Sequence, residues 1–307
     1  MTLAFVFPGQ GSQSVGMMNA FADLPEVRQT FDEASSALGF DLWKRVTDGP
    51  EADLNQTINT QPAVLAAGIA LWRAWQARGG DTPAVAAGHS LGEVVALTAA
   101  GAIDFANAVP LVRTRATLMQ DAVAGQATAM MAVLGLDDDA VIAACAEAAQ
   151  GQVCEAVNFN GPGQVVIAGH TEAVNRAGEI AKAKGAKRAL PLPVSVPSHC
   201  SLLKGAGEAF GEHLQGVTIA APHFPVLQNA DRAAHSDVSA IRDALARQLY
   251  SPVPWTATVA DMAKQGVTRI IECGPGKVLT GLNKRIATEA ECLALSDRAT
   301  FDQLLGG

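Results

Sequence analysis

The sequence is poor in charged residues and contains almost no tyrosine. Charged residues make up 17% of its 307 positions and tyrosine occurs once, whereas hydrophobic residues make up 49%. A chain of this composition can bury a substantial core, which argues against extended disorder. The formal net charge is −8, with 30 acidic residues against 22 basic ones. Because nucleic-acid binding requires a basic surface, this balance argues against a nucleic-acid partner.

Cysteines are few and scattered. None stands in a CxxC pair or at a spacing typical of metal ligands, and the five are Cys145, Cys154, Cys200, Cys273 and Cys292. We therefore expect no metal site and no cofactor, and an odd number of free thiols fits a reducing compartment. No charged-then-apolar leader precedes Leu3, and no apolar run reaches about 18 residues. We expect a soluble, cytoplasmic protein that does not bind a membrane.

Apolar runs that end at glycine or proline alternate with longer helical patterns, which predicts an α/β fold. Strands of the main body are expected at 3–7, 83–88, 225–227 and 269–272. Helices of the body are expected at 25–38, 61–79, 91–100, 106–123, 202–214, 238–250 and 255–265.

Residues 127–195 have a different pattern and are predicted to form a small inserted domain. Its strands are expected at 129–136, 153–158, 165–168 and 188–192. One helix ending at Ala149 and a second at 171–184 complete the order βαββαβ, which is the ferredoxin-like arrangement. The body then comprises residues 1–126 and 196–307.

Gly88-His89-Ser90-Leu91-Gly92 matches the pattern G-x-S-x-G between a predicted strand and a predicted helix. On such a turn the serine is strained and its hydroxyl projects at the carboxyl edge of the sheet. The start of the helix adds free N–H groups and a positive dipole near developing negative charge. Ser90 is the candidate nucleophile, and a turn in which it only caps the helix is the alternative.

A serine nucleophile needs a base to take its proton, and His199 is the best candidate. It stands in Pro193-Val194-Ser195-Val196-Pro197-Ser198-His199, where two prolines hold the chain extended before a helix. A rigid approach suits an imidazole that must be aimed, although a packing role is equally compatible with the residues alone. Cys200 is a rival nucleophile, but it lacks the strand-to-turn setting, and a buried structural cysteine is the favoured interpretation.

Arg115 lies on the apolar side of its predicted helix, whereas Arg113 shares a side with Thr117 and Gln120. A guanidinium that points inward needs an acceptor, because an unpaired buried charge is costly. That acceptor is either an internal Asp or Glu or a carboxylate that arrives with a substrate.

The first loop, FPGQGSQ at 7–13, could form a phosphate cradle. From Gly11 to Gly16 the spacing is that of a P-loop, but Met17-Met18 stand where Lys and Ser or Thr are required. The pattern G-x-G-x-x-G fails as well, since Ser14 replaces the third glycine. A nucleotide-binding protein is therefore the weaker alternative to an enzyme.

Several segments together resemble the malonyl-CoA:acyl carrier protein transacylases. They are FPGQGSQ at 7–13, GHSLGE at 88–93, VRTRATLMQ at 112–120, NFNGPGQVVIAG at 158–169, VPSHCSLL at 196–203 and GPGKVLTGL at 274–282. The resemblance spans nearly the whole chain in the order that the family shows. It implies an α/β-hydrolase-like body with a ferredoxin-like insert, in agreement with the segmentation above.

The resemblance also implies the main catalytic roles. Ser90 would attack the malonyl thioester and carry the malonyl group, while His199 would act as general base and then as general acid. The backbone carbonyl of Gln248, in place of an acidic side chain, would orient the imidazole. Arg115 would bind the malonyl carboxylate.

The backbone N–H groups of Gln10 and Leu91 would form the oxyanion hole, and Asn160 and Gln164 would border the cleft. One departure is Val94, where related sequences have an aromatic residue, and it affects only local packing. The reaction implied is transfer of malonyl from malonyl-CoA to acyl carrier protein in fatty acid biosynthesis, by a ping-pong mechanism.

The implied carrier protein is acidic, so a chain of net charge −8 needs a local basic patch to bind it. Candidates are Lys187, Arg188, Lys277, Lys284 and Arg285, although each could equally be a solvated surface charge. A monomer is expected because no distinct apolar face remains. The nearest rival function is a serine hydrolase, which would ordinarily add an Asp or Glu to complete a triad.

Overall fold

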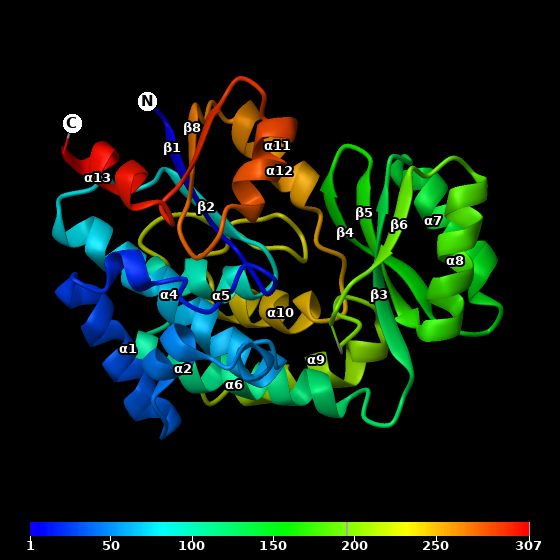
Figure 1. Ribbon diagram of the computed structural model, residues 1–307, viewed down its shortest axis with the longest axis horizontal. Coiled ribbons are helices and arrows are strands. Elements are labelled where there is room, and N and C mark those ends of the chain that lie inside the picture. Colours follow the sequence, from blue (N-terminus) through cyan, green and yellow to red (C-terminus); the bar gives the residue numbers. More distant parts are fainter. Residues whose placement is uncertain (195, 307) are drawn as a thin grey trace.

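The computed structural model describes residues 1–194 and 196–306, which form two β-sheets with helices packed against them (Figure 1). The body sheet has the strand order β7-β2-β1-β8-β9, and all of its pairings are parallel. Its strands are β1 (Leu3–Phe7), β2 (Val85–Gly88), β7 (Val226–Leu227), β8 (Arg269–Glu272) and β9 (Glu291–Ala294).

Helices of the body lie on both faces of this sheet. Those that precede the insert are α1 (Pro25–Leu38), α2 (Leu42–Asp48), α3 (Glu51–Leu54), α4 (Thr57–Ala77), α5 (Leu91–Ala99) and α6 (Phe105–Asp121). Those that follow it are α9 (Lys204–Leu214), α10 (Val238–Gln248), α11 (Trp255–Lys264), α12 (Val278–Ile286) and α13 (Arg298–Gly306). Short 3-10 turns occupy Asn19–Phe21 and Ser201–Leu203.

Strand β1 is apolar throughout because its alternate side chains enter two different cores. Phe5 lies in the core with α4, where its ring meets those of Trp72 and Trp75 at centroid distances of 5.3 and 5.4 Å. Ala4 and Val6 lie in the opposite core, which α11 and α12 also line. Helices on both faces are what a parallel sheet requires, and the parallel pairing brings the carboxyl ends of all its strands to one edge.

The insert forms an antiparallel sheet in the order β4-β5-β3-β6. Its elements are β3 (Thr128–Leu134), α7 (Asp138–Ala149), β4 (Cys154–Gly161), β5 (Gln164–His170), α8 (Thr171–Ala183) and β6 (Arg188–Pro191). The predicted ferredoxin-like order is confirmed. Helices α7 and α8 cover the face turned away from the body (Figure 1), and Met130 and Val166 on the other face pack with Cys200 of the body.

The predicted division at 127 and 195 stays a prediction, and Ser195 and Gly307 lie outside the described residues. Helix α4 begins at Thr57, earlier than the expected residue 61, because its polar first turn carries no apolar signal. Elements α2, α3, α12, β9 and α13 were not predicted.

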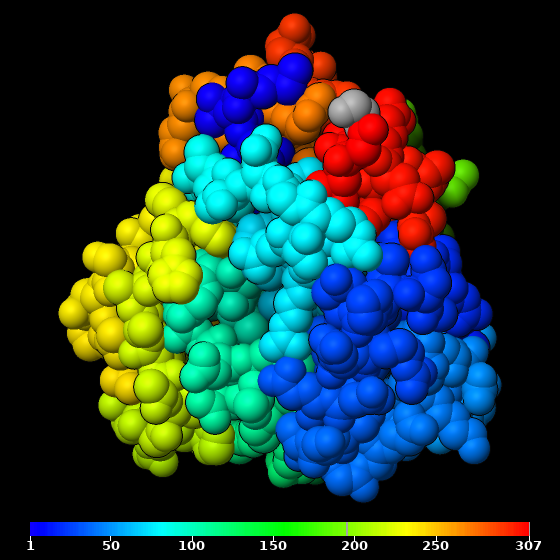
Figure 2. Space-filling model, turned by 90° about the vertical axis from the view of Figure 1, so that its left-hand side faces the viewer, coloured from blue at the N-terminus to red at the C-terminus, as the bar shows by residue number. Residues whose placement is uncertain are grey.

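The two ends of the described chain are packed together. Figure 2 shows the red C-terminal residues beside the blue N-terminal ones. Arg298 pairs with Asp23 at 2.7 Å, and the ring centroids of Phe21 and Phe301 lie 5.5 Å apart. None of the helices in the described residues combines the length and apolarity needed to cross a membrane.

Candidate active site

Ser90 lies on the turn between β2 and α5, at the carboxyl edge of the parallel sheet. Its φ of 54° and ψ of −113° are a conformation that costs a non-glycine residue about 1–3 kcal/mol. The turn is tight because a Cβ on Gly88 would lie 1.8 Å from the carbonyl carbon of Gly92. A Cβ on Gly92 would lie 2.0 Å from the carbonyl oxygen of Phe7. Both glycines of the motif are therefore steric requirements.

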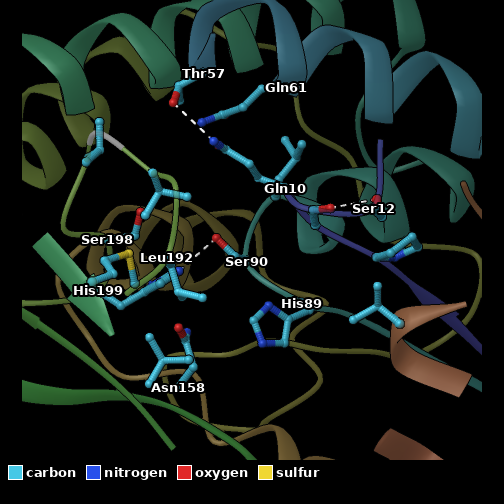
Figure 3. Close-up of a pocket in the computed structure, with 18 of the residues that line it drawn as sticks. Gln10, Ser12, Thr57, Gln61, His89, Ser90, Asn158, Leu192, Ser198 and His199 are labelled. Carbon is cyan, nitrogen blue, oxygen red and sulfur yellow. Dashed lines mark hydrogen bonds between the residues drawn. The ribbon is translucent and has the colours of Figure 1, made fainter. Parts of the chain in front are cut away.

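His199 faces Ser90 across the cavity (Figure 3), with Nε2 2.8 Å from the serine Oγ. Its Nδ1 lies 2.8 Å from the backbone carbonyl oxygen of Gln248. A carbonyl only accepts hydrogen bonds, so Nδ1 carries the proton and Nε2 accepts from the Ser90 hydroxyl. Burial and the nearby charge of Arg115 lower the pKa of His199 to about 3, which keeps the imidazole neutral. A neutral imidazole with its free nitrogen on a serine is equipped to act as a base.

Arg115 is 1% exposed, so its predicted inward orientation is confirmed. Its guanidinium donates to Oε1 of Gln61 at 3.0 Å, to Oε1 of Gln248 at 2.8 Å and to Oγ of Ser90 at 3.1 Å. Within the described residues it forms no salt bridge, and its Nε has no hydrogen-bond partner. Burial lowers the pKa of Arg115 only to about 10, opposed by the charge of nearby Glu93, so a full positive charge stands beside the nucleophile with no carboxylate in direct contact among the described residues.

The first loop packs directly on the serine turn. A Cβ on Gly9 would lie 2.5 Å from the carbonyl oxygen of His89 and 3.8 Å from Cβ of Ser90. The loop is held by its own side chains, since Ser12 Oγ donates to the Gly9 carbonyl at 2.8 Å and Gln10 Nε2 donates to Thr57 Oγ1 at 3.2 Å. Such a loop presents its backbone to the cavity at the place where the serine projects (Figure 3).

The backbone N–H groups of Gln10 and Leu91 both remain without an acceptor among the described residues. Both residues line the cavity at Ser90. Leu91 is the first residue of α5, where a helix leaves its N–H groups unsatisfied. The arrangement offers two donors to a developing oxyanion, which is the predicted role of this pair.

The cavity has a volume of about 190 Å³ and lies between the body and the insert. The body contributes Ser90, His199 and Arg115 to its lining, and the insert contributes apolar side chains such as Met130 and Val166 together with Asn158 and Asn160. Asn160 lines it, with Oδ1 2.8 Å from Nε2 of His89. Gln164 does not meet the expectation for this cavity: it is not among the described residues that line it, and its Oε1 accepts from Arg285 instead.

Several side-chain contacts of the site were not predicted from the sequence. Gln61 holds Arg115, and the side chain of Gln248 bonds to both Arg115 and the Ser90 carbonyl. Asn229 bonds to the Ser90 N–H, and Glu93 bonds in turn to Asn229. Glu93 is the last residue of GHSLGE, and Gln248 was expected for its backbone carbonyl alone. Gln61 and Asn229 carried no signal, because they come from elements far from Ser90 in the chain.

The structure does not support the two alternatives of a Cys200 nucleophile and a phosphate cradle in the first loop. Cys200 is fully buried, its Sγ donates to the Pro197 carbonyl, and burial raises the pKa of its thiol to about 12. Met18, at the P-loop serine or threonine position, is also fully buried and packs in the main core. Neither residue is placed to react with or bind a ligand.

A serine bonded to a neutral histidine, on a strand-to-helix turn with two free backbone donors, is the arrangement that an enzyme needs to carry an acyl group on serine. The comparisons with known proteins agree. Residues 4–292 match the acyl transferase domain family, and the chain belongs to this family.

Individual relatives match along the full chain. The malonyl CoA-acyl carrier protein transacylase of Salmonella typhimurium is 56% identical over 98% of both chains. The crystal structure of an acyl carrier protein S-malonyltransferase from Vibrio cholerae gives a TM-score of 0.96 at 56% identity, covering 99% of this chain and 100% of the other. A malonyl-transacylase solved in complex with its type II PKS acyl-carrier protein gives 0.98 at 53% identity, covering 99% of both.

Proposed function

We propose that the protein transfers a malonyl group from malonyl-CoA to the phosphopantetheine thiol of acyl carrier protein, through a malonyl ester on Ser90. The observation that carries the choice of acyl group is the position of Arg115, whose guanidinium lies 3.1 Å from Oγ of Ser90. Only one methylene separates the malonyl carboxylate from the thioester carbonyl. A cation that binds this carboxylate must therefore lie close to the nucleophile, and Arg115 does.

The first half-reaction forms the ester. Ser90 Oγ attacks the thioester carbonyl carbon while Nε2 of His199 takes the hydroxyl proton. The oxyanion of the tetrahedral intermediate accepts from the N–H groups of Gln10 and Leu91, and loss of one such donor typically costs about 10²–10³ in rate. The carbon–sulfur bond then breaks, and His199 returns the proton to the leaving CoA thiolate.

The second half-reaction reverses these steps with a different thiol. The phosphopantetheine thiol of the carrier protein gives its proton to His199 and attacks the carbonyl carbon of the malonyl ester. The bond to Ser90 Oγ breaks, and His199 returns the proton to the serine. Arg115 holds the malonyl carboxylate in both halves, so the acyl group keeps its position while CoA is exchanged for the carrier protein.

The serine hydrolase alternative is less well supported by the site. Nδ1–H of His199 donates a hydrogen bond to the backbone carbonyl of Gln248, whereas in a triad it would donate to an acidic side chain. Parallel time courses of malonyl-carrier protein and free malonate, with holo acyl carrier protein present, test the choice. We expect malonyl-carrier protein to form in large excess, and free malonate as the main product would refute the transferase.

Helix α12 supports a docking site for the acidic carrier protein at the mouth of the cavity. Val278, Leu279 and Leu282 of this helix line the cavity, and Lys284 and Arg285 on the same helix are exposed. Arg285 also reaches the insert, donating to the carbonyl of Pro162 at 2.6 Å. Of the predicted basic residues, we propose the pair on α12 as the principal contact.

The remaining expectations are part of the same proposal. The protein would act in the cytoplasm as a monomer, supply malonyl units to fatty acid biosynthesis and require no cofactor. Light scattering coupled to gel filtration measures its mass in solution, and a mass of two or more chains would refute the monomer.

A further inference from the structure

Asn229 lies beside the serine turn because of the register of the body sheet. Strand β7 pairs in parallel with β2, and Ala87 stands opposite Leu227. Two residues after this pair, each strand has ended, and Asn229 leaves the sheet at the level of the turn from Gly88 to Ser90. The residue is 1% exposed, so its side-chain amide must be satisfied within the protein.

Both ends of the Asn229 amide bond to the serine turn. Oδ1 accepts from the backbone N–H of Ser90 at 2.9 Å, and Nδ2 donates to the carbonyl oxygen of Gly88 at 2.7 Å. A backbone N–H only donates and a carbonyl only accepts, so these partners fix the orientation of the amide. One side chain thus bridges the two residues on either side of His89, one of which is the strained serine.

Asn229 is itself held by the helix that starts at the turn. Its backbone N–H donates to Oε2 of Glu93 at 2.6 Å, and Nε2 of Gln228 donates to Oε1 of the same carboxyl group at 3.2 Å. Glu93 is fully buried in the first turn of α5. The end of β7 is therefore tied to the turn by Asn229 and to the following helix by Glu93.

We propose that Asn229 is a positioning residue for the acylation of Ser90, an inference that rests on the proposed function. A residue at positive φ keeps that conformation only while its surroundings hold it there. Asn229 constrains the N–H side of Ser90 and Gln248 its carbonyl, and the Asn229 contact keeps Oγ of Ser90 directed at His199. Asn229 is not among the described residues that line the cavity, so it acts through Ser90 and not on the substrate.

The same contact selects the oxyanion donor. The N–H of Ser90 is engaged by Asn229, whereas the N–H of Leu91 has no acceptor among the described residues. The turn therefore presents Leu91 N–H to the oxyanion, next to Gln10 N–H from the first loop.

The test is the single-turnover rate at which malonyl-CoA acylates Ser90 in Asn229→Ala, measured by rapid quench and intact mass. We expect a loss of about 100-fold, because a small displacement of a reacting group has that cost. Binding of malonyl-CoA, measured by calorimetry in a Ser90→Ala background so that no chemistry occurs, is expected to stay unchanged. A purely structural role would lower both together.

Asn59→Ala is the matched control. Asn59 is also buried and also donates and accepts one hydrogen bond, to the Asp53 carbonyl and from Arg45, away from the serine turn. We expect its acylation rate to equal that of the wild type. A loss as large as that of Asn229→Ala would show that any buried amide has the same effect and would overturn the proposal.

Asn229→Asp decides the matter if Asn229→Ala does not fold. When the new carboxyl is ionised, it keeps an acceptor for Ser90 N–H and loses the donor to Gly88, so at the high-pH end of a rate profile we expect about a tenfold loss in acylation rate, the effect of one hydrogen bond. A wild-type rate in either variant overturns the positioning role. If the wild-type protein itself is not acylated at Ser90, the proposed function fails instead, so the two failures are distinguishable.

Discussion

Nη2 of Arg115 donates a hydrogen bond to Oγ of Ser90 at 3.1 Å, while the same hydroxyl oxygen lies 2.8 Å from Nε2 of His199. The cation, the nucleophile and the base thus meet at one oxygen atom. When the carbonyl carbon of an acyl thioester reaches this oxygen, a substituent one methylene away from that carbon lies beside the guanidinium of Arg115. In the proposed reaction, the choice of acyl group and the chemistry are therefore coupled through Arg115 and Ser90.

Substitution of Arg115 should change the preference for acyl groups. Each hydrogen bond to a charged group contributes about 1.5–3 kcal/mol, so Arg115→Ala is expected to lower kcat/KM for malonyl-CoA by at least about 100-fold. Acetyl-CoA has no carboxylate and should lose far less. Arg113→Ala on the same helix is the control, because Arg113 contacts the Leu38 carbonyl and the Phe40 ring instead. An equal loss for malonyl and acetyl would contradict the carboxylate-binding role.

The acylation rate should show no decrease at mildly acidic pH that is caused by protonation of the base, His199. The pKa of His199 is lowered to about 3, so the imidazole is protonated, and the base lost, only as the pH falls through about 3. We expect the rate with malonyl-CoA to show no decrease near pH 6.5 that belongs to His199. Acylation rates of the wild type and of Glu93→Gln are measured between about pH 4.5 and about pH 8, a range that spans the ordinary pKa values of Glu and His. A decrease caused by titration of Glu93 is then present in the wild type and absent from Glu93→Gln. A limb near 6.5 in both proteins would contradict the lowered pKa.

Glu93 should make the free energy of unfolding depend on pH. Burial raises its pKa from 4.5 to about 7, so between these values the folded protein holds a proton that the unfolded chain releases. The contribution of this group to stability is therefore present at low pH and is lost as the pH rises to about 7. Glu93→Gln cannot titrate and should gain stability relative to the wild type over that interval, by about 3 kcal/mol at most. Urea unfolding at both ends of the interval measures this, and a constant difference would refute it.

Gly9→Ala should impair the oxyanion hole more than the fold. Its Cβ would lie 2.5 Å from the carbonyl oxygen of His89, so the first loop must move and carry the Gln10 N–H away from Ser90. We expect kcat to fall about 10²–10³-fold, the cost of losing one oxyanion donor. Gly281→Ala is the control, because its Cβ meets nothing within 4 Å. Wild-type turnover in a folded Gly9→Ala protein would remove Gln10 from the mechanism.

The α12 docking site can be tested by charge reversal. Lys284→Glu and Arg285→Glu are expected to raise KM for the carrier protein while leaving the acylation rate with malonyl-CoA unchanged, since neither side chain lines the cavity. Lys187→Glu on the insert is the comparison. If only the insert variant raises KM, the carrier protein docks there and the α12 assignment is wrong.

Local sequence signals predicted much of this architecture. The strand, turn and helix around Ser90 follow from an apolar run, two glycines and an alanine-rich segment, and each of these acts within a few residues. Arg115 was identifiable because a charge on an apolar helical face contradicts the pattern around it. His199 could be singled out only by its proline-rich approach, which left a packing role open until the geometry was known.

The rest of the site depends on contacts that no local pattern encodes. Asn229 reaches the serine turn through the register of β7 on β2, and Gln248 meets Arg115 from the end of α10. Gln164 was expected at the cleft from its motif, yet Arg285 draws its side chain into another contact. Periodicity indicates which face of an element is buried, but not which distant element it will face.

In the proposed reaction, Ser90 carries the malonyl group between two thiols. Intact-mass analysis after brief incubation with malonyl-CoA, followed by addition of holo acyl carrier protein, tests it most directly. We expect one added malonyl group per chain, located on Ser90 and absent from Ser90→Ala, and we expect it to move to the carrier protein when that is added. No mass increase in the wild type, or an adduct that persists in Ser90→Ala, would contradict it.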